Sequence, residues 1–296
     1  MDIHLTTPSV RQLDGVVATL RSWQADDQAL QLHPGDLGWY SMRGVAATAA
    51  AIRVWSADDR IVTVGLLDGD DVLRMAFDPQ VRDEDELVQR LAADLDDRQH
   101  GPLSADAASV EARGAEHLKR ILTEERGWQP DELWVPFRRD LSSPVAEPGV
   151  RVEVTGPDQA AAWVGVHWSA FRGTPMAEDD LQRRVGFWRT MADGPIYAGA
   201  RSLAAFDTGG QMVAVSTVWS AGPGRPGLIE PMGVHHDHRR MGYGTAITRA
   251  AATALRDLGA SSAIVCTEHA RTGALVTYAA AGFTADPPVA DLRRKS

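Results

Sequence analysis

The chain has 296 residues, of which 44% are hydrophobic and 24% charged, and its formal net charge is −10 at pH 7. This length predicts two domains of ordinary globular composition. The negative charge argues against a broad interface with a nucleic-acid backbone. The single cysteine excludes an intramolecular disulfide.

No targeting or membrane segment is indicated. The N-terminal residues 1–5 lack a basic region followed by a long apolar core, so we expect no secretory signal peptide. The apolar stretch 45–52 is too short to span a bilayer. Cys266 lies in an apolar run, which is typical of a buried structural thiol. We therefore expect a cytoplasmic protein without membrane or nucleic-acid partners, and its oligomeric state stays open.

The first half of the chain combines helical and strand patterns. Apolar spacing predicts helices, a hairpin and a further strand. The predicted helices cover 16–23, 84–95 and 115–124, the hairpin pairs 52–56 with 61–67, and the strand covers 71–77. Gly127-Trp128 follows the last of these helices.

The segment from Ser142 to Gly149 contains two prolines, two serines and a glycine, which makes a packed element unfavourable there. We therefore place one domain over residues 1–141, a linker over 142–149 and a second domain over 150–296.

The second half alternates strands and helices, which indicates an α/β or α+β class. Predicted strands cover 150–154, 202–206, 212–219, 228–234, 262–267 and 289–293. Predicted helices cover 157–171, 177–191, 245–258 and 272–281, and Gly259 is a C-terminal cap for the third. The turn 207–210 joins two of the strands as a hairpin.

The segment 233–246, GVHHDHRRMGYGTA, joins a predicted strand to a predicted helix. A helix N-terminus presents free backbone N–H groups and a partial positive charge. Gly242 and Gly244 have no side chain that could block a ligand from these amides. Arg239 and Arg240 add charge that suits diphosphate oxygens. The segment is therefore predicted to bind an anion.

Other readings of this loop fit less well. It lacks the Gly-Lys-Ser/Thr ending of a P-loop and the third glycine of the dinucleotide fingerprint. A zinc site would require His235, His236 and His238 to converge, and no distant ligand completes a known spacing, so we predict no metal. On the loop alone, a strand-to-helix turn without a ligand is the remaining alternative.

Val234 followed by Arg239-x-x-Gly242-x-Gly244 resembles the acetyl-CoA-binding motif of the GNAT N-acetyltransferase superfamily. The strand 230–234 resembles the family's strand before this loop. The segment 271–283 resembles its late helix, which ends in Tyr-x-x-x-Gly-Phe. The resemblance covers residues 150–293, with one departure at Arg271, where many members carry asparagine.

The resemblance implies two tandem GNAT-like domains of α/β (α+β) class, each with a mixed, mostly antiparallel sheet flanked by helices. It implies acetyl transfer from acetyl-CoA to a primary amine of a small molecule or peptide by direct attack, without a metal. The strands splay near Pro231 in the family and hold the pantetheine arm between them. The implied cofactor contacts are Met232, Val234, Arg239, Arg240, Met241, Gly242, Tyr243, Gly244, Thr245 and Ala274.

Two side chains are candidates for proton transfer. The attacking amine must be neutral, and strand alternation places Glu230 on the face of Met232 and Val234 as a base, directly or through water. A strand-end salt bridge is the alternative role for this carboxylate. The resemblance makes Tyr278 the acid that protonates the departing thiolate, and a core tyrosine is the alternative. A backbone N–H near Val234 would stabilise the oxyanion.

Aromatic side chains gather in the predicted helices 157–171 and 177–191, which in the family form one wall of the acceptor groove. Trp168, Phe171 and Trp188 are candidate substrate contacts, and about half of the rings in these helices are expected in the core. An acidic chain favours a cationic amine, while a peptide amine is equally compatible. A non-enzymatic acyl-CoA-binding or structural tandem module is the second function class.

The first half repeats the order of elements with altered chemistry. Where the anion-binding loop is expected, residues 83–86 are four consecutive acids, which would repel a diphosphate. Thr123 stands four residues before Gly127, as Tyr278 stands before Gly282. We predict a diverged, non-catalytic copy that packs on the active one and helps to shape the acceptor site.

Overall fold

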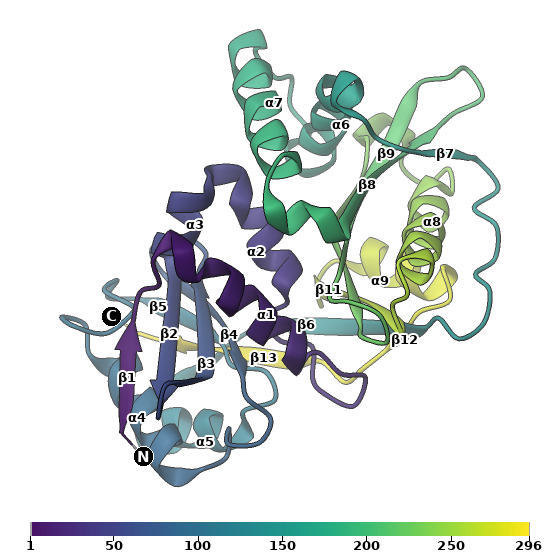
Figure 1. Cartoon of the computed structure of the whole chain (residues 1–296). Helices are drawn as coiled ribbons and strands as arrows, with labels where there is room; N and C mark the ends of the chain where they lie inside the picture. Colours follow the sequence, from purple (N-terminus) through teal and green to yellow (C-terminus); the bar gives the residue numbers. More distant parts are fainter. Residues whose placement is uncertain (1, 296) are drawn as a thin grey trace.

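The computed structural model describes residues 2–295 and contains one continuous sheet with helices packed on it (Figure 1). In the first half the helices are α1 (Leu13–Trp23), α2 (Pro34–Tyr40), α3 (Val45–Ala51), α4 (Asp85–Asp96) and α5 (Glu116–Glu124). The strands are β1 (Ile3–Thr6), β2 (Ile52–Ala57), β3 (Arg60–Leu67), β4 (Val72–Phe77), β5 (Ala108–Glu111) and β6 (Gln129–Asp140).

In the second half the helices are α6 (Ala160–Arg172), α7 (Glu178–Ala192), α8 (Tyr243–Asp257) and α9 (Thr272–Ala280). The strands are β7 (Arg151–Val154), β8 (Ala200–Phe206), β9 (Met212–Ser220), β10 (Gly227–Val234), β11 (Ser262–Glu268), β12 (Thr284–Ala285) and β13 (Val289–Arg294). All helices and strands predicted from the sequence are present, with ends that differ by a few residues. The elements β1, α2, α3, β5, β6 and β12 were not predicted.

The strand order has mirror-like symmetry between the two halves. The sheet runs β1-β2-β3-β4-β5-β13-β6-β11-β10-β9-β8-β7, and β12 pairs with β6 off this path. Most neighbours are antiparallel, and the parallel pairs, β4 with β5 and β10 with β11, occupy equivalent places in the two halves. This order is the expected pair of mixed, mostly antiparallel sheets, joined through their last strands.

The last strands are exchanged between the halves. Strand β6 pairs with β11 along seven residues, from Ser262 with Asp140 to Glu268 with Trp134. Strand β13, from the end of the chain, pairs with β5 and with the beginning of β6. Segment 142–149 contains no helix or strand, and the division of the chain at this segment stays a proposal. Each half therefore completes the other half's sheet.

The exchange also mixes the hydrophobic cores. Leu292 of β13 packs in the core formed by β4, β5, α4 and α5. Val135 and Phe137 of β6 pack in the core beneath α8 and α9. A further core joins α1 and α2 to α6, α7 and β9, so the halves share a buried apolar interface. Burying apolar surface at roughly 25 cal/mol per Å² makes such an interface a major part of the fold's stability.

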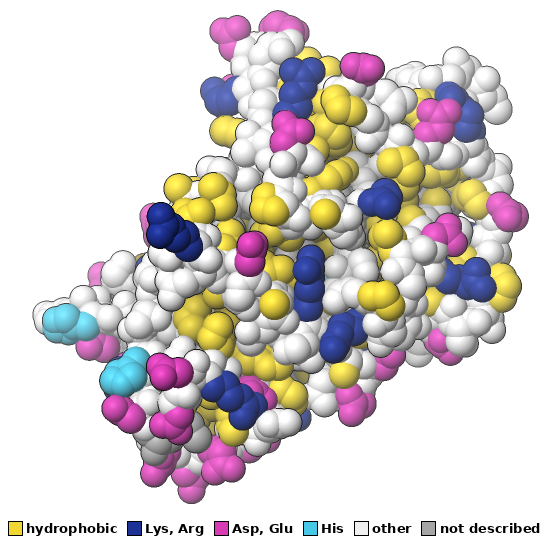
Figure 2. All heavy atoms as spheres, viewed as in Figure 1, with side chains coloured by type: hydrophobic (Ala, Val, Ile, Leu, Met, Phe, Trp, Pro, Cys, Tyr) yellow, Lys and Arg dark blue, Asp and Glu magenta, His cyan; other side chains and the backbone are white. Residues whose placement is uncertain are grey.

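The surface carries mixed charge. On the face in Figure 2, basic side chains lie scattered among apolar and acidic ones. Among the described residues, no helix has the length and apolar character needed to cross a membrane.

Helix α2 connects the halves through His33, which precedes it. The Gly35 N–H donates to His33 Nδ1 at 2.9 Å, so the ring proton is on Nε2, which donates to the Pro226 carbonyl at 3.2 Å. The ring is therefore neutral, with both nitrogens bonded. Complete burial lowers the pKa of His33 to about 4.

This histidine predicts acid-sensitive stability. The unfolded chain binds a proton at His33 near pH 6.5, whereas the folded chain binds it only near pH 4, so the free energy of unfolding falls as pH drops through that window. The loss at this site is at most about 3 kcal/mol. Urea unfolding at pH 7.5 and 4.5 measures it. His33→Gln keeps polar groups but cannot titrate, so the variant should lose less stability between these pH values; an equal loss would contradict the assignment.

Candidate active site

Strand β10 carries an irregularity at the proposed base. Ile229 pairs with Val218 of β9, and Met232 pairs with Ser216, so three steps along β10 match two along β9. Glu230 and Pro231 form this bulge. Proline cannot donate a ladder hydrogen bond, which fits its place here. The bulge also interrupts the two-residue alternation of side chains.

The interruption corrects one prediction. Met232 and Val234 pack with Ile229 against the core that contains α8 and α9. Glu230 instead forms an ion pair with Arg74 of β4, in the first half of the chain. The prediction that Glu230 shares a face with Met232 and Val234 is wrong, because the extra residue of the bulge shifts the alternation by one.

Strands β10 and β11 separate just before this bulge. They pair in parallel only at Gly227 with Ala263 and Leu228 with Ile264. Beyond this point β11 continues along β6, and β10 continues along β9. The splay expected near Pro231 is therefore present, and it turns an edge of β10 towards the gap between the strands.

Backbone groups of Met232 and Val234 lie along this edge. The His235 N–H donates to the Val213 carbonyl of β9, so residues of odd number point their backbone groups towards β9 there and those of even number point away. Within residues 2–295, no backbone bond from another segment reaches this edge at Met232 or Val234. An extended ligand with amide groups could pair with it as an added strand does.

The glycine-rich loop ends at the N-terminus of α8. Gly242 has a φ of +86° and Arg240 one of +63°, so the chain turns through left-handed conformations before the helix. A Cβ on Gly242 would meet nothing within 4 Å, so the space beside this residue is open. The first helical backbone bond joins the Ala246 N–H to the Gly242 carbonyl, which leaves the preceding amides available to an anion.

Gly244 also has a packing role. A Cβ at this residue would lie 3.0 Å from Thr277 Cγ2 of α9 and 3.5 Å from Val234 Cγ2. Gly244 therefore permits the close packing of α8 on α9, and Gly242 alone keeps space open beside the loop. Tyr243 packs against the core on the same side, and Thr245 is half-buried.

The predicted cationic and apolar contacts surround this loop. The Arg239 guanidinium donates to the Ala170 carbonyl of α6 at 2.6 Å, which ties the loop to that helix. Arg240 is exposed. Met241 of the loop is 64% exposed, and Val276 of α9 is 69% exposed, so both elements carry an exposed apolar side chain. Arg271 pairs with Glu268 at 2.8 Å, and nearby Ala274 is half-buried.

Tyr278 is buried on α9 between two other rings. Its ring centroid lies 5.4 Å from that of Phe137 on β6 and 6.3 Å from that of Phe283. Burial raises the pKa of Tyr278 above its ordinary value, and charge at Cys266 and Glu230 acts in the same direction. The phenol therefore keeps its proton at neutral pH. Burial likewise raises the pKa of Cys266 to about 11, which fits a structural thiol.

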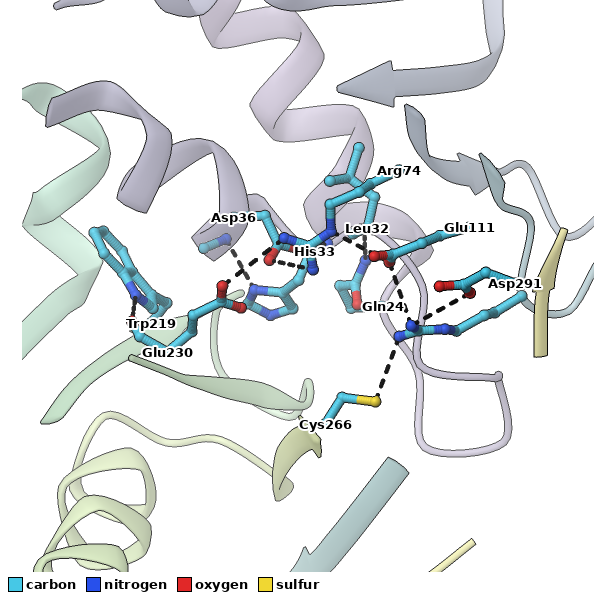
Figure 3. A network of polar contacts seen from close by, with 12 residues as sticks. Gln24, Leu32, His33, Asp36, Arg74, Glu111, Trp219, Glu230, Cys266 and Asp291 are labelled. Carbon is cyan, nitrogen blue, oxygen red and sulfur yellow. Dashed lines mark hydrogen bonds and ion pairs between the residues drawn. The ribbon is translucent and has the colours of Figure 1, made fainter. Parts of the chain in front are cut away.

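Glu230 lies in a network of charged groups between the halves (Figure 3). Its carboxylate is 3.8 Å from Arg74 Nη1, and its side chain is 32% exposed. Partial burial raises the pKa of Glu230 to about 8; the Arg74 cation opposes this, and Asp36 and Glu111 reinforce it. A base performs best when its pKa is near the working pH, and the exposed part of this side chain can reach a substrate.

The predicted substrate-binding aromatics occupy different environments. Phe171 is 51% exposed and lies beside Gly233 of β10. Trp168 is half-buried and holds Arg184 over its ring at 4.4 Å. Trp188 is only 4% exposed and packs in the core shared by the halves, so its position favours a packing role. Ring contacts connect Phe171 to His167 and His167 to Trp39 of the first half, which sequence reasoning missed.

The equivalent groove of the first half is filled by the chain itself. Strands β4 and β5 pair in parallel only as far as Arg74 with Glu111 and then separate. At the edge that β4 exposes beyond this point, the Leu32 N–H donates to the Met75 carbonyl at 3.1 Å. The Phe77 N–H donates to the Gln31 side chain at 3.0 Å. The residues 31–32 thus take the place that stays open along β10.

The helix after this filled groove is also unsuited to an anion. Helix α4 begins at Asp85, with Glu84 as its N-cap and Asp85 and Glu86 in its first turn. The negative charges of these carboxylates offset the partial positive charge at the N-terminus of the helix. Thr123, which stands where the second half has Tyr278, bonds back to the Lys119 and Arg120 carbonyls of α5.

Three neighbouring residues of the loop bring possible metal donors together. One atom each from His235, His236 and Asp237 lies within 4.8 Å of the others. His236 also contacts Ser169 Oγ at 2.7 Å and Asp237 at 2.9 Å, so it already has protein partners. A structural zinc site takes four protein ligands, so these three residues would need a further one.

Comparisons with known proteins agree with this geometry. Residues 163–283 match the model of the acetyltransferase (GNAT) family. A mycothiol acetyltransferase from Sanguibacter keddieii is 32% identical over 174 residues, which are 52% of each chain, so the match spans about half the length of this curated relative.

Solved structures share the fold along the whole chain. A tandem GNAT protein from the clavulanic acid biosynthesis pathway has a TM-score of 0.63 at 15% identity, over 99% of this chain and 98% of that one. A GNAT-family acetyltransferase from Colwellia psychrerythraea has a TM-score of 0.61 at 14% identity, over 100% of both. Residues 163–283, in the second half, are thus similar to the GNAT family, and the two solved structures share the fold over the whole chain.

The loop predicts a specific loss of cofactor affinity. Gly242→Glu would place a carboxylate in the open space beside the α8 amides, so acetyl-CoA affinity measured by calorimetry should fall well over tenfold. Gly242→Asn is the matched control, because asparagine tolerates left-handed φ without adding charge, and it should lose much less. Equal affinities for the wild type and Gly242→Glu would exclude this loop as the diphosphate site.

Proposed function

We propose that this protein transfers an acetyl group from acetyl-CoA to a primary amine of a small molecule or peptide, in its second half. The observation that carries the proposal is the free edge of β10 at Met232 and Val234, next to the open space at Gly242. The family match over residues 163–283 and the mycothiol acetyltransferase relative support acetyl transfer.

The second half has a suitable group for each part of acetyl-CoA. The α8 amides and Arg240 would bind the diphosphate. The pantetheine amides would pair with the edge at Met232 and Val234. The exposed side chains of Met241 and Val276 would cover apolar parts of the bound molecule. The thioester would then lie near the bulge at Glu230, where the strands separate.

The proton transfers follow from the two titratable groups. Glu230 accepts a proton from the acceptor amine, and the amine nitrogen attacks the thioester carbonyl carbon. The resulting oxyanion is stabilised by a backbone N–H near Val234. When the carbon–sulfur bond breaks, Tyr278 donates its proton to the thiolate, and the products are an acetylated amine and free CoA. Burial keeps Tyr278 protonated for this role.

The net charge of −10 favours a positively charged acceptor. Around Glu230 the charges are nearly balanced, because Arg74 pairs with Asp36 and Glu111, and Arg113 also pairs with Glu111. An amine is mostly protonated at neutral pH, so it loses that proton to solvent before its nitrogen attacks and Glu230 accepts the second. Phe171, exposed beside β10, offers an apolar contact to the rest of the acceptor.

Replacing the acid tests the chemistry. A panel of primary amines, assayed by release of the CoA thiol, identifies an acceptor for the wild type. Tyr278→Phe keeps the ring that packs on Phe137 but removes the proton. Turnover should fall by about 10²–10⁴-fold, while calorimetry should show nearly unchanged acetyl-CoA affinity. Full turnover in Tyr278→Phe would make the residue a packing tyrosine only.

A further inference from the structure

Helix α2 of the first half is short, but the sequence contains strong local signals for where it begins. His33 is the N-cap, Pro34 is the first helical residue, and Asp36 Oδ2 accepts a hydrogen bond from the His33 N–H at 2.6 Å. Proline at the first position and a side-chain cap at the third fix a helix start. The sequence thus sets where α2 begins, and the position of Asp36 follows from it.

The segment before α2 is anchored in the filled groove of the first half. Leu32 is 1% exposed, and its N–H bonds to Met75 of β4. The Gln24 amide donates to the Leu32 carbonyl at 3.3 Å and to the Leu20 carbonyl at 3.1 Å. The chain therefore leaves the groove at a fixed point and enters α2 directly. A bound cofactor at this edge of β4 would exclude such an anchor.

Helix α2 itself packs on the second half of the chain. A Cβ on Gly35 would lie 2.5 Å from Trp219 of β9, and one on Gly38 would lie even closer to the same indole. Only glycine permits so close an approach of the helix to this ring. Trp219 Nε1 donates to the Glu230 carbonyl at 2.7 Å. Helix α2 thus sits on the residue that holds the backbone of Glu230.

Side chains of α2 and β4 then reach Glu230 directly. Arg74 Nη2 lies 2.9 Å from Asp36 Oδ1, its Nε lies 3.2 Å from Glu111, and its Nη1 lies 3.8 Å from Glu230 (Figure 3). Arg74 is 16% exposed and Asp36 is 2% exposed, so water screens these contacts weakly. The planar guanidinium is held by two carboxylates and presents its remaining nitrogen to the third.

We propose that Arg74 and Asp36, from the half without its own cofactor groove, are positioning residues of the active centre that hold the Glu230 carboxylate. This inference rests on the proposed role of Glu230 as the base. The first half is thereby an integral part of the site: its own groove anchors α2, and α2 and β4 orient the base on β10.

The two positioning residues have opposite effects on the pKa of Glu230. Arg74 of β4 favours the carboxylate, whereas Asp36 of α2 and Glu111 of β5 disfavour it. Tyr278 of α9 lies close enough for Glu230 to influence its charge and is neutral at working pH. Removing Arg74 should therefore raise the pKa of Glu230, and removing the charge of Asp36 should lower it.

Carbon-13 NMR of the full chain with labelled glutamate carboxyls measures this pKa without an acceptor, and Glu230→Gln identifies the signal by its loss. Arg74→Gln should raise the pKa of Glu230 by about one pH unit or more, and Arg74→Lys should restore most of the difference. Asp36→Asn keeps an oxygen for the helix cap and should lower the pKa. Arg60→Gln breaks an ion pair with Asp78 in the same half and should leave it unchanged.

With an acceptor from the amine panel, the acid limb of kcat/KM should move in the same direction as each NMR titration. The inference is overturned if Glu230 has the same pKa in the wild type, Arg74→Gln and Asp36→Asn, all of them folded. Should Arg74→Gln not fold, the shift in Asp36→Asn decides. Shifted titrations together with full turnover in Glu230→Gln would instead overturn the base assignment and leave the positioning contacts supported.

Discussion

The exchange of β6 and β13 fixes how the two halves of the chain pack against each other. Each strand completes the sheet of the opposite half, and each delivers core side chains there, such as Leu292 and Phe137. Phe137 also packs on Tyr278, so the exchanged strand reaches the proposed acid. Because backbone ladders fix register, the halves cannot slide or turn relative to each other without breaking hydrogen bonds. This rigidity keeps Arg74 within reach of Glu230 across the junction.

The two halves share a strand order, but the edge left where a parallel strand pair separates has a different role in each. In each, a parallel pair separates and leaves an edge of the inner strand unpaired. Along β10 that edge stays free, beside a glycine-rich loop. Along β4 residues 31–32 occupy it, and the following helix begins with acids. One plan of the backbone thus leaves a free strand edge in one half and provides an anchor for α2 in the other. The side chains and the connecting segment decide which.

Much of the fold could be predicted because the long, periodic elements can be recognised from the spacing of their own apolar residues. The apolar faces of α8 and α4 and the hairpin of β8 and β9 depend on their own residues. The elements that were missed, such as β5, β6 and α2, are short, edge-like or stabilised mainly by distant partners. The loop 239–245 could be located through its glycines, whereas the partners of Glu230 could not: the bulge at Pro231 reverses the face, and Arg74 is 156 positions away in the chain. Only tertiary packing supplies that contact.

We propose that the chain has one working cofactor groove, in its second half, and that the first half supports it. Hydrogen exchange of the full chain, with and without saturating acetyl-CoA, distinguishes one groove from two. We expect slower exchange of amides at Met232, Val234 and 241–245, and unchanged exchange over 75–88, because residues 31–32 already fill that groove. Comparable protection of both regions, with two molecules bound per chain, would show that both halves bind the cofactor and rule out this proposal.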